Sequence, residues 1–260
     1  MASGHLHEQN IDAYAQLQSP FHQWEMRLKI VALFVLMIAF ALVNDVRLLP
    51  AMIAVTLVIY AMAKLPWSFL RSRLTVPGYF IIALVIFLPF VAGSTPLAEW
   101  GGITIRQEGL EQAVLIVGRF FCIFTTAIVL FSTNTFLNAI RALRGLRFPD
   151  IMADMLLLTY RYLFEIGNLF TTIRTAARLR GFDGSLFAPS SFKTLTSLAG
   201  HLLVRSYEQS QQVYTAMVLR GYGTQGVKIH HAKPIAADYL KAAVIIGTAV
   251  LLLITQGLIQ

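Results

Sequence analysis

Residues 110 to 131 read L-E-Q-A-V-L-I-V-G-R-F-F-C-I-F-T-T-A-I-V-L-F, and this run decides the fold. A helix that crosses the hydrocarbon core of a bilayer needs about 20 apolar residues, within a range of about 17 to 25. The run has that length and is apolar almost throughout. It therefore predicts a transmembrane helix.

Four more apolar runs accompany it, at residues 28–43, 48–63, 76–92 and 239–259. The first three are near the short end of the spanning range, so any one of them could be a half-buried or re-entrant element. The whole chain is 57% hydrophobic and 13% charged, against roughly 25% charged residues in an average soluble domain. Because such a chain lacks the polar surface of a soluble protein, we predict an all-α, polytopic integral membrane protein with about five transmembrane helices.

The distribution of lysine and arginine predicts the orientation, because cytoplasmic loops carry an excess of both. Arg27 and Lys29 stand at the start of the first run, so the N-terminus is predicted to be cytoplasmic. Residues 64–75 are basic and residues 93–109 are not, which places the former inside and the latter outside. Twelve of the 21 basic residues fall within 132–238, which returns this region to the cytoplasm and leaves the C-terminus outside.

These assignments divide the chain into a cytoplasmic N-terminal segment, a four-helix transmembrane region, a cytoplasmic helical region and a C-terminal transmembrane helix, at 1–27, 28–131, 132–238 and 239–260. The N-terminal segment lacks the apolar stretch of a cleaved signal peptide. The expected location is the plasma membrane, in contact with the lipid bilayer. The formal charge of +8 belongs mainly to cytoplasmic loops, so no nucleic-acid partner is expected.

The cytoplasmic region contains two long helical patterns, at residues 150–180 and 191–220. Apolar residues recur at helical spacing in the first, while Asp154, Arg161 and Glu165 argue against its crossing lipid. Asp150, after Pro149, is expected near the N-cap. At 1.5 Å per residue each helix would be about 45 Å long. We predict two amphipathic helices packed together beneath the membrane.

Both helices end on the same phrase. Residues 175–182 read T-A-A-R-L-R-G-F and residues 215–222 read T-A-M-V-L-R-G-Y. Gly181 and Gly221 fit the C′ position, where a left-handed backbone stops a helix. Phe182 and Tyr222 then follow where an apolar side chain can pack on the last turn.

The repeat has two interpretations. Leu-Arg-Gly-aromatic is good capping chemistry by itself, since a cation is favoured at the C-terminal end of a helix. Capping does not require arginine, leucine and Thr-Ala in a common frame, whereas a shared external partner does. The guanidinium groups of Arg180 and Arg220 would then be available for bidentate pairing with carboxylates.

With these residues the sequence resembles the transmembrane component of energy-coupling-factor transporters, which are ABC-type importers of metal ions and vitamins. In that family two cytoplasmic coupling helices each carry a short motif, usually Ala-Arg-Gly. The matching triplets are Leu179-Arg180-Gly181 and Leu219-Arg220-Gly221, with leucine in place of alanine. Residues 11–22 and 158–166 resemble the cobalt/nickel subfamily called CbiQ.

The resemblance implies a coupling subunit and not an enzyme. Two cytoplasmic P-loop ATPase subunits would bind ATP-Mg, and a separate membrane subunit would capture cobalt or nickel. The resemblance to the CbiQ subfamily also implies a link to cobalamin biosynthesis. The two triplets would dock on the ATPases, supported by Phe182, Tyr222 and Arg178, although Arg178 is matched by Val218 in the second copy. The chain itself has no G-x-x-x-x-G-K-[ST] loop, and we expect it to bind no cofactor.

Arg119 and the histidines are further candidates. An unpaired arginine inside a span costs at least about 2.5–3.5 kcal/mol, so Arg119 should contact either another membrane subunit or an internal partner such as Glu111. His5 with His7 and His230 with His231 form pairs, but a metal site normally needs three or four ligands. We therefore predict no metal site in this chain, and His22 and His201 stand alone.

Three alternatives remain open from the sequence. Within the family, a general vitamin-type coupling subunit would lack an ion pocket in the same way. A secondary transporter would also be polytopic, although internal repeats and polar midplane residues are expected there. A membrane scaffold could use basic amphipathic helices without any ATPase. Copurification with a P-loop ATPase would separate the coupling subunit from the last two.

Overall fold

The structure, a computed structural model, describes residues 21, 24–86, 88, 96–100, 103–146, 148–181, 189–223 and 236–259. The described elements fall into two compact units. One contains α8 (Asp150–Leu179) and α9 (Pro189–Leu219), and we call it the helix-pair unit. The other, which we call the membrane unit, contains the remaining helices and a β-hairpin. The predicted all-α class is confirmed.

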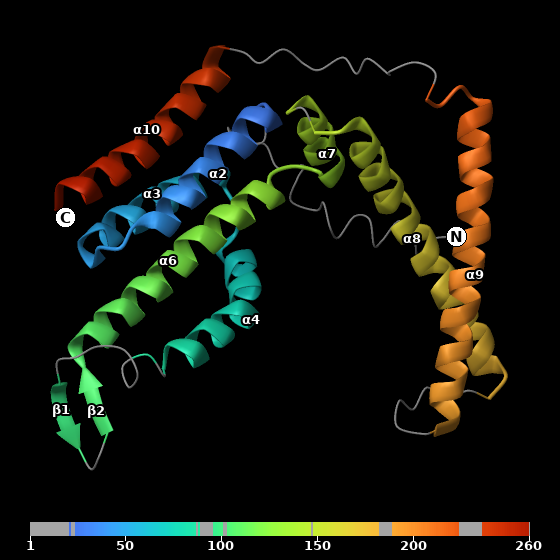
Figure 1. Cartoon of the computed structure of the whole chain (residues 1–260), viewed down its shortest axis with the longest axis horizontal. Coiled ribbons are helices and arrows are strands. Elements are labelled where there is room, and N and C mark those ends of the chain that lie inside the picture. Colours follow the sequence, from blue (N-terminus) through green and yellow to red (C-terminus); the bar gives the residue numbers. More distant parts are fainter. Residues whose placement is uncertain are drawn as a thin grey trace. The chain divides into compact units, whose positions relative to one another are not determined.

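The membrane unit is built around α2 (Met26–Leu42), which packs against α6 (Gln107–Ser132) and α10 (Ala236–Ile259). The 3-10 turn η1 (Val46–Leu48) leads into α3 (Leu49–Ala63), which also lies along α6 (Figure 1). Buried side chains of α2 such as Leu33, Leu36 and Phe40 form the centre of the apolar core. Lipid offers the backbone no hydrogen-bond partner, so these segments satisfy their backbone groups by forming helices.

The relative directions of these helices agree with the predicted alternation. At one end of α2, Trp24 Nε1 donates to the Asp238 carbonyl at 3.2 Å; at the other, Gln256 Nε2 donates to the Leu42 carbonyl at 3.1 Å. The residue numbers of the two helices increase in the same direction, so α2 and α10 are parallel. Lys29 bonds Thr133, whereas Arg119 bonds Val43, so α6 runs antiparallel to α2. The predicted topology requires both relations: the first and fifth spans cross the membrane in the same direction, and the fourth span crosses in the opposite direction.

Among the described residues, three helical segments are long and apolar enough to cross a membrane, at Val46–Ala63, Gly109–Ser132 and Ala236–Leu258. These confirm a multi-pass membrane protein. The helix α2 is shorter, with 17 residues. The count of five spans therefore stays a prediction.

The third predicted span differs from the structure. Residues 64–75 were expected to be a loop, but α4 (Trp67–Val85) begins at Trp67 and continues through Pro77. Lys64 ends α3 in the left-handed region, at φ 54°, and Pro66 precedes the new helix. Proline usually marks a helix end. The apolar pattern around Pro77 therefore predicted a start at residue 76, whereas the helix begins at Trp67.

Two smaller elements were not predicted. The strands β1 (Pro96–Trp100) and β2 (Ile103–Arg106) pair as an antiparallel hairpin in the segment assigned to the outside. The short helix α7 (Phe136–Gly145) follows α6 and packs on α2. The Thr135 hydroxyl caps it by accepting from the Asn138 amide at 3.4 Å. Of the arginines that follow α6, Arg141 and Arg144 lie on this helix.

Candidate functional site

The helix-pair unit consists of two long helices that lie side by side, as predicted (Figure 1). The helix α8 has 30 residues and α9 has 31. The amide of Gln209 donates to the Glu165 carboxylate at 2.6 Å, and the Tyr222 hydroxyl donates to the Asp154 carboxylate at 3.1 Å. The residue number of the α8 partner decreases as the residue number along α9 increases, so the two helices are antiparallel. The two repeated phrases consequently lie at opposite ends of the pair.

The first phrase ends α8 as the sequence predicts. Arg180 is the C-cap residue, and its amide donates to the Ala177 carbonyl at 3.0 Å. Gly181 follows with φ +90°, and its amide donates to the Arg178 carbonyl at 3.0 Å. Residues other than glycine rarely adopt this left-handed conformation. Phe182, expected to pack on this end, lies outside the described residues.

The second phrase forms a complete Schellman motif. Gly221 has φ +84°, and its amide donates to the Val218 carbonyl at 2.9 Å. The Tyr222 amide donates to the Met217 carbonyl at 3.0 Å, which is the longer bond that defines the motif. The predicted glycine caps are thus confirmed at both helices.

The residues around the caps are presented to solvent. Leu179 is 85% exposed and Leu219 is 83% exposed, and Arg180 and Arg220 are also exposed. A cation beside an exposed leucine offers both a bidentate hydrogen-bond donor and an apolar contact. Neither leucine is needed for the cap itself. Each helix end therefore presents a hydrogen-bond donor and an apolar side chain side by side at the surface.

The supporting aromatic, Tyr222, has a role that capping alone does not explain. It is 40% exposed, and its hydroxyl reaches across to Asp154 in the second turn of α8. The sequence pattern predicted packing on its own helix, not a bond to the neighbouring helix. Arg178 is exposed on α8 two residues before the C-cap.

Arg119 has internal partners in the membrane unit. Its guanidinium donates to the Val43 carbonyl and, at 3.2 Å, to the side-chain oxygen of Asn44. These groups stand at the C-terminal end of α2, where backbone carbonyls lack helical partners. The Nε atom of Arg119 is buried without a hydrogen-bond partner among the described residues. The contacts favour the internal role over a contact with another subunit.

Lys29 differs from its prediction. The charge pattern predicts a basic flank of the first span, but the side chain of Lys29 is 0% exposed inside the membrane unit. Its ammonium donates to the Phe21 carbonyl at 2.8 Å and to the Thr133 hydroxyl. It thereby joins α2 to the turn between α6 and α7. Its neighbour Arg27 pairs with Glu25 at 3.2 Å, close to the expected flank. Only tertiary contacts distinguish these two cations.

Within the described part of the chain, no group of three His, Cys, Asp or Glu residues could hold a metal. His201 is exposed on α9. The other five histidines, His5, His7, His22, His230 and His231, lie outside the described residues, so the absence of a metal site stays a prediction.

The comparisons with known proteins agree with this architecture. The family model described as cobalt transport protein, CbiQ, matches residues 18–230. The energy-coupling factor transporter transmembrane protein EcfT of Limosilactobacillus fermentum is 28% identical over 228 residues, which cover 81% of this chain and 82% of that protein. The EcfT of Streptococcus equi is 26% identical over 221 residues, with 80% and 81% covered. An uncharacterized protein of Methanocaldococcus jannaschii is 29% identical over 168 residues, with 62% and 60% covered.

The family match, together with an apolar helical membrane unit and two long glycine-capped helices, identifies a transmembrane component of an energy-coupling-factor transporter. The chain belongs to the CbiQ family of cobalt transport proteins. It is accordingly a non-catalytic, multi-pass membrane component of such a transporter.

Proposed function

We propose that the chain couples ATP hydrolysis by two cytoplasmic P-loop ATPase subunits to the uptake of cobalt or nickel through a separate membrane subunit. The observation that carries the proposal is the pair of equivalent, exposed helix ends at Arg180 and Arg220. Two identical docking motifs suit two equivalent partners. The ATPases would bind ATP-Mg, and this chain would bind no cofactor.

The antiparallel helix pair suits this role because it separates the two docking points. Tyr222 contacts Asp154, so the Arg220 end lies beside the start of α8 while the Arg180 end lies a helix length away. The intervening residues of α8 correspond to about 40 Å at 1.5 Å per residue. One ATPase can then engage each end. Closure of the two ATPases would move both ends of a rigid pair and so transmit force to the capture subunit.

Support for the metal ion comes from the family description, which names cobalt transport. A general vitamin-type coupling subunit is the second candidate, because the relatives that are 28% and 26% identical carry the general energy-coupling factor name. The proposed orientation places the N-terminus and residues 132–238 in the cytoplasm and the C-terminus outside, in the plasma membrane. A scaffold or secondary transporter would need no ATPase partner.

The proposal is tested by purification of the tagged chain from its own membranes. We expect two copies of a P-loop ATPase and one small membrane protein to copurify, and reconstituted vesicles with internal ATP-Mg on the ATPase side to accumulate radioactive cobalt. Inhibition of cobalt accumulation by nickel would support metal uptake, whereas inhibition by a vitamin mixture would support the vitamin-type coupling subunit. Purification of the chain without any ATPase would support the scaffold instead.

A further inference from the structure

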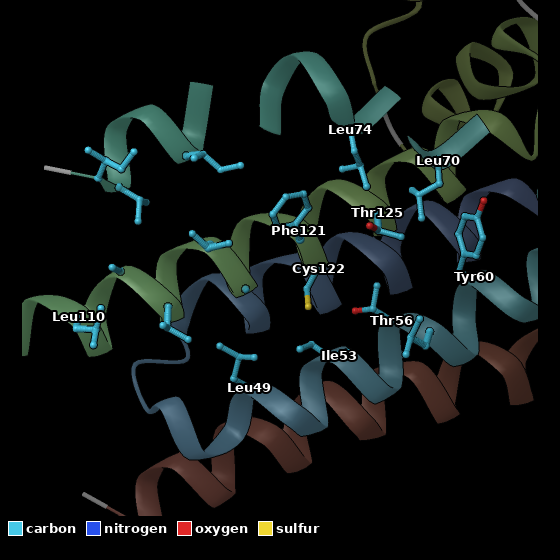
Figure 2. A pocket seen from close by; sticks show the side chains of 18 residues that line it. Leu49, Ile53, Thr56, Tyr60, Leu70, Leu74, Leu110, Phe121, Cys122 and Thr125 are labelled. Carbon is cyan, nitrogen blue, oxygen red and sulfur yellow. The ribbon is translucent and has the colours of Figure 1, made fainter. Parts of the chain in front are cut away.

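An apolar groove lies between α3, α4 and α6 in the membrane unit. Its volume is about 900 Å³, within the range of about 300–1,000 Å³ typical of ligand pockets. Figure 2 shows side chains of all three helices facing it, with Leu49 and Leu110 toward one end and Tyr60 and Leu70 toward the other. The groove belongs to the membrane unit alone, and its lining does not include Arg119, Val43 or Asn44.

Two of the three hydroxyl groups on its wall, those of Thr56 and Tyr60, already donate hydrogen bonds to backbone carbonyls. The Thr56 hydroxyl donates to the Met52 carbonyl at 2.8 Å, and the Tyr60 hydroxyl donates to the Pro66 carbonyl at 2.9 Å. The remaining lining consists mainly of aliphatic and aromatic side chains. A polar ligand would lose its own hydrogen bonds on entering such a site. The chemistry of the wall therefore selects a hydrocarbon.

One end of the groove is strongly basic. Lys64 follows α3 four residues after Tyr60, and Arg71 and Arg73 lie on α4 between the groove residues Leu70 and Leu74. All three cations are exposed. No acidic residue occurs between positions 60 and 86. Basic sites beside membrane helices bind anionic lipid headgroups, so this end is complementary to a phosphate.

We propose that the groove binds an acyl chain of an anionic phospholipid whose headgroup is held by Lys64, Arg71 and Arg73. The lipid would fill the space between α4 and its neighbours and hold α4 against α6. The exposed cations at one end favour a phospholipid over a transmembrane helix from another subunit, because an apolar helix offers them no negative charge.

The test uses the full chain reconstituted in vesicles that contain equal amounts of phosphatidylglycerol and phosphatidylcholine with identical acyl chains. After mild extraction, native mass spectrometry counts the lipids that stay bound. We expect phosphatidylglycerol to be retained in preference. Each cation near an anionic lipid headgroup contributes to the binding free energy. The double variant Arg71→Gln/Arg73→Gln should therefore lower the ratio of bound phosphatidylglycerol to phosphatidylcholine by roughly ten- to thirty-fold. Arg47→Gln, near the opposite end of α3, should leave the ratio unchanged.

A second pair of variants tests the groove itself. Val114 lines the groove and is 50% exposed, whereas Val250 on α10 is 46% exposed and lies outside the groove lining. Val114→Trp should displace the bound lipid, and Val250→Trp should not. Ile53→Trp, on the opposite wall, repeats the test if Val114→Trp does not fold.

Three results would overturn the proposal. Equal retention of both lipids by the unmodified chain would remove the headgroup site. Unchanged retention in the folded Val114→Trp and Ile53→Trp variants would place the lipid elsewhere. A crosslink from a photoreactive residue at Val114 to another subunit, in the complex purified from native membranes, would assign the groove to that subunit.

Discussion

The hydroxyl of Tyr222 donates a hydrogen bond to the Asp154 carboxylate across 3.1 Å, and this bond joins the end of α9 to the second turn of α8. Tyr222 directly follows Gly221, the residue that stops α9. The Arg220 motif is therefore held in two ways, by its own Schellman bonds and by the neighbouring helix. This relationship gives Tyr222 a positioning role at the Arg220 end.

Loss of that bond should have a small, specific effect. Tyr222→Phe removes one hydrogen bond in an exposed setting, which contributes about 0.5–1.5 kcal/mol. We expect the free energy of unfolding to fall by no more than about 1.5 kcal/mol and ATPase binding to weaken by at most about ten-fold. Tyr207→Phe, also exposed on α9, is the matched control. If Tyr222→Phe abolished binding entirely, the tyrosine would contact the ATPase directly.

The two arginines should carry most of the binding. Truncation of one member of a buried, hydrogen-bonded charge pair typically costs about 2–5 kcal/mol, and exposed pairs cost far less. Arg180→Ala or Arg220→Ala should therefore weaken ATPase retention or uncouple hydrolysis from uptake. The double variant should abolish uptake. Retention on affinity resin and cobalt uptake into vesicles measure the two effects.

Arg178→Ala is the matched control for these variants, because Arg178 is exposed on the same helix and has Val218 as its counterpart in the second phrase. We expect a smaller loss than for Arg180→Ala. Full retention and full uptake in the Arg180→Ala/Arg220→Ala variant would reduce the repeated phrase to two helix caps.

The glycines should matter through backbone geometry. Gly181 has φ +90° and Gly221 has φ +84°, and a left-handed alanine costs roughly 1–2 kcal/mol. Gly181→Ala and Gly221→Ala should fray the last turn and weaken ATPase retention. Gly200→Ala is the control, because Gly200 lies inside α9 with open space around it. It should raise helix stability by up to about 1 kcal/mol. Equal effects at all three positions would contradict the role of the caps.

Lys29 should stabilise the membrane unit. Lys29→Met keeps an unbranched apolar stem but leaves the Phe21 carbonyl without the ammonium. An unsatisfied buried polar group costs about 1–3 kcal/mol, so we expect lower thermal stability in detergent. Lys193→Met, an exposed change on α9, should have an effect within about 0.5 kcal/mol. A Lys29→Met variant as stable as the unmodified chain would show that the buried bonds contribute nothing.

The orientation is tested by labelling of introduced cysteines in intact cells, after replacement of the single native cysteine, Cys122. Positions Ser94 and Gln260 should react with an impermeant reagent from outside, and Gly184 should not. The alternation of lysine and arginine is the physical reason. Labelling at Gly184 would contradict the proposed topology.

Apolar length predicted the membrane class, the helical spacing of apolar residues predicted the two long helices, and the repeated Leu-Arg-Gly phrase predicted their glycine caps. These features are local: a run of about 20 apolar residues already satisfies the bilayer, and a glycine at C′ already permits the left-handed turn. The relative directions of α2, α6 and α10 also follow from the alternation of basic loops, and the bonds of Lys29, Arg119 and Gln256 agree with them.

Tertiary structure decided what depends on neighbours distant in the chain. Pro66 and Pro77 look alike in the sequence, yet one precedes α4 and the other lies within it. Arg27 and Lys29 look like one cytoplasmic flank, yet Lys29 is completely buried because the Phe21 carbonyl and Thr133 accept its hydrogen bonds. The bond from Tyr222 to Asp154 likewise requires the antiparallel pairing of α8 and α9. Helix propensity, capping and hydropathy act over a few turns of one segment, whereas the burial of a charge is set by the groups that the fold brings around it.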